Sequence, residues 1–190
     1  MSFSELVIFI RDHFVIVPWG HWVIISVLAL TACLWVGKKN SIYCGIAFGV
    51  TVFIALFLLE TAIVIRCCDL VSYTSGFDFA AERKRFFHGT VYDWRQILLN
   101  IVVFAPFGFF LSEFLASAKW FSTGRRLGHV VLAGFALSLC IECLQLVLRV
   151  GIFELTDLVM NTLGAFVGAG MAVGLRLLWM RGKRREMELH

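Results

Sequence analysis

The sequence predicts an all-α membrane protein in which about five transmembrane helices form a compact bundle, preceded by an N-terminal interfacial amphipathic helix. Two observations predict this fold class. Of the 190 residues, 60% are apolar and 16% are charged, whereas a soluble domain is about half apolar and a quarter charged. Five stretches are also long and apolar enough to cross a bilayer. The composition excludes a soluble enzyme, a nucleic-acid-binding module and a disulfide-stapled secreted domain.

Each predicted span holds the roughly 17–25 mostly apolar residues that a spanning helix needs. Lysines follow the first span instead of preceding it, so this span is expected to be retained and not removed as a signal peptide. Together the spans make residues 18–180 a single transmembrane bundle. They cover residues 18–37, 41–65, 97–116, 127–148 and 158–180.

Three segments lie outside the spans. Residues 1–17 mix charged residues with Phe, Ile and Val, which is typical of an interfacial amphipathic helix. Residues 66–96 form one long loop, whose aromatic residues alternate with basic ones and therefore suit the lipid headgroup zone. Residues 181–190 form a basic tail suited to anionic lipid headgroups. Membrane lipids are therefore expected partners, and nucleic acid is not.

The distribution of Lys and Arg predicts the orientation in the membrane. Five spans place residues 38–39, 119–126 and 181–185 on one side, and this side is the more basic once the long loop is given less weight. Positive charge favours the cytoplasmic side. We therefore expect an external N-terminus, an external loop 66–96 and a cytoplasmic C-terminus.

Polar side chains inside the spans are predicted to gather at one side of the bundle. A charged group at the bilayer centre costs on the order of 3 kcal/mol, so such residues call for a partner or a function. Because successive spans run in opposite directions, seven of these residues fall toward the predicted outer side, and only Glu113 falls toward the other. The seven candidate ligand-binding residues are Glu60, Asn100, Glu142, Gln145, Arg149, Asp157 and Asn161.

Helical periodicity places several of these residues on common faces. At roughly 100° per residue, Glu142, Gln145 and Arg149 fall within about 60° of arc, and so do Asp157 and Asn161 with the glycines that follow them. Polar stripes of this kind face a bundle interior or a cavity. The small-residue patterns at 164–168 and 45–49 predict close approach between helices.

The residue types indicate a cleft rich in hydrogen-bond donors and acceptors. Arg149 can clamp a carboxylate or phosphate. Carboxylates can serve an amine or hydroxyl ligand, or transfer a proton, which makes Glu142 and Asp157 the candidate catalytic residues. The same groups can also bond only to one another and fix the helix register. No metal-binding motif or cofactor motif is present, and Cys140 and Cys143 are expected to pack as small apolar residues.

Three motifs resemble those of the VanZ-like family. The patterns N-x-x-x-F-x-P-F-G from Asn100, S-x-x-x-E-x-x-Q from Ser138 and D-x-x-x-N-x-x-G-x-x-x-G from Asp157 follow one another within residues 97–170. The family consists of small bacterial membrane proteins, and its namesake confers low-level resistance to the glycopeptide teicoplanin. The resemblance implies a multi-pass protein of the bacterial cytoplasmic (inner) membrane that acts on cell-envelope material.

Two functions follow as the leading expectations. In the first, an outward-facing polar cleft binds or shields a lipid-linked envelope precursor or a lipoglycopeptide such as teicoplanin. In the second, the chain is a membrane-embedded acid/base enzyme acting on an envelope lipid or precursor at the outer leaflet, with Glu142 or Asp157 transferring the proton and Arg149 holding the anion. A transporter subunit and a purely structural role for the polar stripes are the remaining alternatives.

Overall fold

The computed structural model describes residues 19–68, 94–148 and 153–188. Within these ranges the regular structure is helical, and five helices are long and apolar enough to cross a membrane. The predicted all-α bundle of about five transmembrane helices is therefore confirmed. The interfacial segment predicted at 1–17 and most of the loop predicted at 66–96 lie outside the described residues. The helices are α2 (Trp19–Lys39), α3 (Ile42–Cys68), α5 (Trp94–Ser117), α6 (Thr123–Val147) and α7 (Leu155–Glu188).

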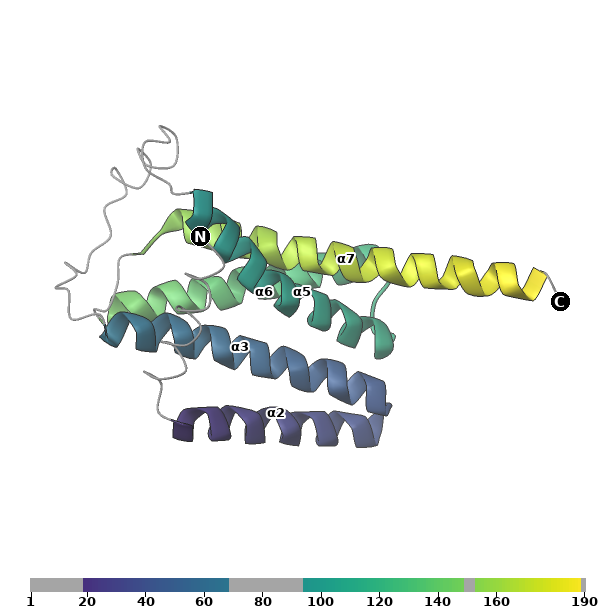
Figure 1. Cartoon of the computed structure of the whole chain (residues 1–190), viewed down its shortest axis with the longest axis horizontal. Helices are drawn as coiled ribbons and strands as arrows, with labels where there is room; N and C mark the ends of the chain where they lie inside the picture. The colour runs from purple at the N-terminus through teal and green to yellow at the C-terminus, as the bar shows by residue number, and fades with distance from the viewer. Residues whose placement is uncertain (1–18, 69–93, 149–152, 189–190) are drawn as a thin grey trace.

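The helices form a bundle in which α5 and α7 pack most closely (Figure 1). The α6 helix packs against α7 and α5, while α3 joins α5 to the outermost helix, α2. Successive helices run in opposite directions, so the bundle has two distinct ends. We call the end where α3 finishes and α7 begins the loop end, and the end where α3 begins the tail end. Polar residues far apart in the sequence meet at these two ends.

The α2–α3 hairpin turns within two residues. The hydroxyl of Ser41 accepts a hydrogen bond from the backbone N–H of Cys44 at 3.1 Å, which caps the first turn of α3. Gly45 and Gly49 then lie against the backbone of α2 near Cys33, so closely that a Cβ atom at either position would overlap it. The predicted small-residue contact of this helix is therefore present.

Glycines also determine how closely α7 approaches α5. A Cβ atom at Gly164 would overlap the carbonyl oxygen of Ile101, and one at Gly168 would overlap that of Ala105. Residues of this size allow two backbones to touch, which is how membrane helices gain packing energy without a hydrophobic driving force. This contact places the first turn of α7 beside the first turns of α5.

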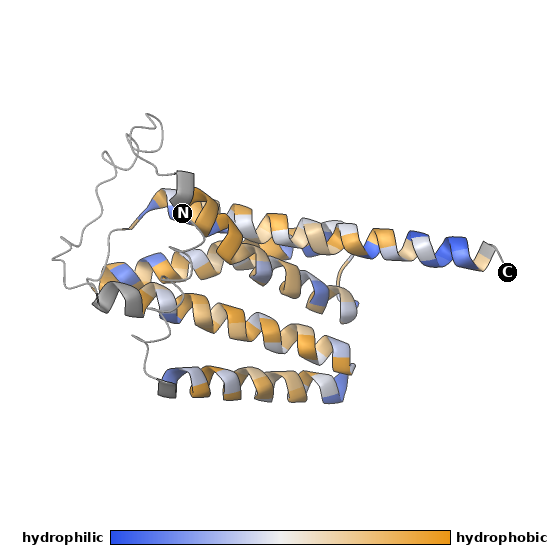
Figure 2. Ribbon diagram, in the orientation of Figure 1, coloured by the Kyte–Doolittle hydropathy of each residue, from blue (hydrophilic) through white to orange (hydrophobic). Residues whose placement is uncertain are grey.

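The bundle carries apolar side chains on its outside and polar side chains within. Large apolar residues such as Val23, Leu132 and Leu178 are each more than 60% exposed, and apolar residues cover much of the helix surface (Figure 2). Lipid tails solvate such a surface, whereas polar groups must be satisfied inside the bundle. The buried polar residues are Thr51, Ser112, Glu113, Arg126, Ser138, Glu142, Gln145, Thr156, Asp157 and Asn161.

The last helix is longer than a bilayer requires. Its 34 residues correspond to about 51 Å at 1.5 Å per residue, against a hydrocarbon core of about 30 Å. The final turns of α7 extend past the other helices and are strongly hydrophilic (Figures 1 and 2). Residues 181–188 of the predicted basic tail thus continue the fifth spanning helix without a break.

Candidate functional site

The first turns of α7 connect to both neighbouring helices through polar side chains. The Nδ2 of Asn100 in α5 donates a hydrogen bond to Oδ1 of Asp157 at 2.7 Å. One turn further along α7, the Nδ2 of Asn161 donates to the hydroxyl of Ser138 in α6 at 2.9 Å. Asp157 lies in the first turn of α7, where the helix dipole favours a negative charge. The polar stripe predicted for this helix therefore faces the bundle interior.

The polar stripe of α6 meets the start of α7 and the end of α3. Glu142 is 2% exposed, and its Oε2 accepts a hydrogen bond from the backbone N–H of Glu154 at 2.8 Å. Gln145 is equally buried, and its Nε2 donates to the carbonyl oxygen of Ala62 at 3.0 Å. Glu142 therefore fixes the chain just before α7 begins and places a carboxylate near the positive end of that helix.

The remaining two predicted site residues, Glu60 and Arg149, are not part of these contacts. Glu60 lies on the last turns of α3, where its Oε1 is 2.9 Å from Nδ1 of His21 in α2. No hydrogen bond between described residues links Glu60 to the rest of the predicted set. Arg149 lies outside the described residues, so its predicted role as an anion clamp stays a prediction.

Several buried oxygen atoms near the loop end are left without a hydrogen-bond partner among the described residues. Besides the carboxylate oxygens of Glu60, they are Oε1 of Gln145 and Oγ1 of Thr156, and Thr156 is only 3% exposed. Leaving such an atom unsatisfied costs about 1–3 kcal/mol. Thr156 was not predicted from the sequence, although its position beside Asp157 in the first turn of α7 was a usable signal. We call Asn100, Glu142, Gln145, Thr156, Asp157 and Asn161 the loop-end cluster.

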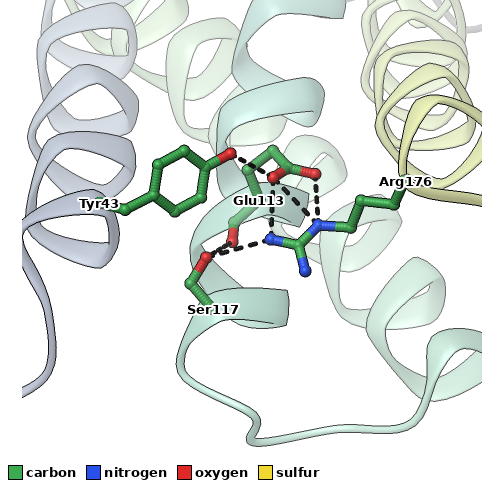
Figure 3. A network of polar contacts seen from close by, with 4 residues as sticks. All are labelled: Tyr43, Glu113, Ser117 and Arg176. Carbon is green, nitrogen blue, oxygen red and sulfur yellow. Dashed lines mark hydrogen bonds and ion pairs between the residues drawn. The ribbon is translucent and has the colours of Figure 1, made fainter. Parts of the chain in front are cut away.

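Glu113 forms a separate network at the tail end (Figure 3). Arg176 donates from Nε to Oε1 and from Nη2 to Oε2 of this carboxylate, both at 2.9 Å. The hydroxyl of Tyr43 donates to Oε2 at 2.5 Å, and the Nη2 of Arg176 also donates to the hydroxyl of Ser117 at 3.1 Å. These four residues, the tail-end network, tie α3, α5 and α7 together.

The partners of Glu113 were not found in the sequence, although one signal was available. Arg176 is the only charged residue in the predicted span 158–180. A lone charge among so many apolar residues requires a partner within the bundle. The side of the membrane predicted for Glu113, opposite the other polar residues, agrees with its place at the tail end.

The described residues contain no group of three His, Cys, Asp or Glu side chains that could hold a metal ion. Cys140 and Cys143 are exposed on α6 and carry free thiols, as do Cys33 and Cys44. Cys44 is buried, whereas Cys140 and Cys143 face outward from α6 and do not pack inside the bundle as expected.

The family model described as VanZ/LLP1 matches residues 41–179, which include both the loop-end cluster and the tail-end network. No curated protein and no solved structure matches the chain.

Proposed function

The chain belongs to the VanZ/LLP1 family, and on this premise we propose that it is a VanZ-like membrane protein that binds or shields a donor-rich envelope ligand at its loop-end cluster. The ligand is the polar head of a lipid-linked cell-envelope precursor or a lipoglycopeptide such as teicoplanin. The protein acts at the outer leaflet of the bacterial cytoplasmic membrane.

The unpaired acceptors at the loop end carry this proposal. Oε1 of Gln145 and Oγ1 of Thr156 are buried without a partner among the described residues. Gln145 follows the acid Glu142 by one turn of α6, and Thr156 directly precedes Asp157 in α7. A site of this composition is complementary to a ligand that brings hydroxyl, amide N–H or ammonium donors. Sugar and peptide head groups carry such donors in large number. A phosphate alone does not, because it presents acceptors.

Binding ranks above proton transfer as the role of the two carboxylates. Asp157 accepts a hydrogen bond from Asn100, and Glu142 accepts one from the backbone of Glu154. These hydrogen bonds hold both carboxylates in fixed positions, which suits a recognition surface.

The sharpest test replaces the unpaired hydroxyl. Thr156→Val removes a buried group that has no partner among the described residues, so the empty protein should be at least as stable as the unaltered one. Loss of one ligand hydrogen bond should weaken binding about three- to tenfold. Binding of teicoplanin and of a lipid-linked disaccharide pentapeptide would be measured with the purified full chain in lipid nanodiscs.

Thr162→Val is the matched control, since it makes the same change on the same helix at a hydroxyl that bonds its own backbone at Leu158. It should leave the affinity within twofold. The proposal is overturned if the unaltered protein binds neither probe, or if Thr156→Val binds as tightly as the control. Conversion of the precursor by the unaltered protein, lost in Asp157→Asn, would select the enzyme alternative instead.

A further inference from the structure

A pocket of about 610 Å³ opens at the tail end, beside the tail-end network. This volume lies within the range of small-molecule binding sites, about 300–1,000 Å³. Its lining has a charged part and an apolar part. Glu113, Arg126 and Arg176 form the charged part, and the apolar part includes Phe109, Trp179 and Met180.

The charges in this pocket do not balance. Glu113 is engaged by the guanidinium of Arg176 through paired hydrogen bonds, which neutralises that positive charge. Arg126 lies close enough to both for their charges to interact, but no described residue accepts a hydrogen bond from its side chain. The Arg126 side chain is nevertheless buried, because the residue is only 8% exposed and its Nε is fully covered. The pocket therefore holds one excess, largely buried positive charge.

A buried guanidinium without a partner is costly, and an anion in the pocket would remove that cost. The guanidinium fork matches the oxygens of a phosphate, to which it can donate two parallel hydrogen bonds. Glu113 and Ser117 hold the neighbouring Arg176 in a fixed orientation (Figure 3), so a second guanidinium is already in place beside the first.

The apolar part of the lining faces the surrounding lipid. Trp179 is 68% exposed and Met180 is 51% exposed, although both line the pocket. A second hollow of about 390 Å³ adjoins the first, shares Leu177 and Met180 with it, and is otherwise lined by Arg181, Arg184 and Arg185. A ligand in this pocket would meet guanidinium groups at one end and apolar side chains and lipid along its length. The ligand that matches both parts is an anionic amphiphile.

We propose that the tail-end pocket binds an anionic phospholipid, with its phosphate on Arg126 and an acyl chain along Trp179 and Met180. The site is separate from the loop-end cluster and does not depend on the function proposed there. It lies on the side of the membrane that is predicted to be cytoplasmic.

The experiment compares two adjacent arginines. Arg125→Gln and Arg126→Gln remove the same charge from the same turn of α6, but Arg125 is exposed and does not line the pocket. Binding of phosphatidylglycerol and phosphatidylcholine to the purified full chain would be measured by native mass spectrometry from micelles. Phosphatidylglycerol should bind at least about tenfold more tightly to the unaltered protein. Arg126→Gln should lose about tenfold of that affinity, and Arg125→Gln less than twofold.

Thr123→Glu tests the site without disturbing a buried group. Thr123 lines the pocket, is exposed, and is the first residue of α6, where the helix dipole favours an acid, so the variant should fold normally. Its charge should repel the phosphate and lower phosphatidylglycerol binding about tenfold. Thr123→Gln should bind as the unaltered protein does.

Three results would overturn the proposal. The first is equal binding of the two lipids, and the second is an equal loss of affinity in Arg125→Gln and Arg126→Gln, which would indicate attraction to surface charge alone. The third is full competition by inorganic phosphate at millimolar concentration, which would identify free phosphate as the ligand in place of a lipid.

Discussion

Single residues at the two ends of the bundle satisfy buried charge in different ways. At the tail end, both oxygens of Glu113 accept hydrogen bonds from Arg176, and one also accepts from Tyr43. At the loop end, the acids bond to an amide and to a backbone N–H, and neighbouring acceptors stay unpaired among the described residues. The carboxylate of Glu113 is therefore fully engaged, which suits stability. The unpaired acceptors at the loop end are the basis of the ligand site proposed there.

The ion pair at the tail end makes a prediction at this scale. Glu113→Gln leaves the guanidinium of Arg176 without its counter-charge inside the bundle. Removing one partner of a buried pair costs about 3–5 kcal/mol, and partial exposure of Arg176 lowers this to about 2 kcal/mol. The thermal unfolding midpoint in detergent should fall accordingly.

Tyr43→Phe, which removes one hydrogen bond to the same carboxylate, should lower the free energy of unfolding by only about 1 kcal/mol. Equal midpoints for the two variants would contradict the assignment of Glu113 and Arg176 as the stabilising pair.

At the scale of helices, the close contact of α5 and α7 positions both polar sites. Gly164 and Gly168 allow the two backbones to touch, so Asp157 reaches Asn100 at the loop end and Arg176 reaches Glu113 at the tail end. The two sites therefore share one structural support.

This contact predicts an asymmetry between two glycines of the same helix. Gly168→Ala places a methyl group on the carbonyl oxygen of Ala105 and should destabilise the bundle by about 1–3 kcal/mol. Gly170→Ala meets nothing within 4 Å and should be neutral or stabilise by up to about 1 kcal/mol, because Ala favours the helix. Thermal unfolding of the two variants measures the difference. A stable Gly168→Ala protein would show that the helices are not in backbone contact.

At the scale of the whole molecule, five antiparallel helices place the start of α2 and the end of α7 at opposite ends of the bundle, so we expect the two chain ends on opposite sides of the membrane. The basic side is predicted to be cytoplasmic. A reporter enzyme fused after His190 should therefore be active only in the cytoplasm, and a small tag inserted in residues 69–93 should be accessible only from outside. If the reporter were active only outside and the tag accessible only from the cytoplasm, the loop-end cluster and the tail-end pocket would exchange leaflets, and the fold would be unchanged.

The sequence was a good guide to the helices and to the depth of their polar groups. Hydropathy alone marked five spans, and their alternation put Asn100, Gln145 and Asp157 near one end and Glu113 near the other. It was a poor guide to partners. The bond from Glu142 to the chain before α7 and the pair between Glu113 and Arg176 depend on how helices are rotated against one another.

What the sequence determined by itself is the membrane fold, because apolar runs of bilayer length admit few structures other than helices that satisfy their own backbone. It also determined which faces of α6 and α7 are polar, because the helical repeat fixes angles along one chain segment. Only the tertiary structure decided which faces meet, where the tail-end pocket opens and which atoms of Gln145, Thr156 and Arg126 lack a described partner. These features depend on contacts between backbones many residues apart, at glycines whose fit appears only when both helices are in place.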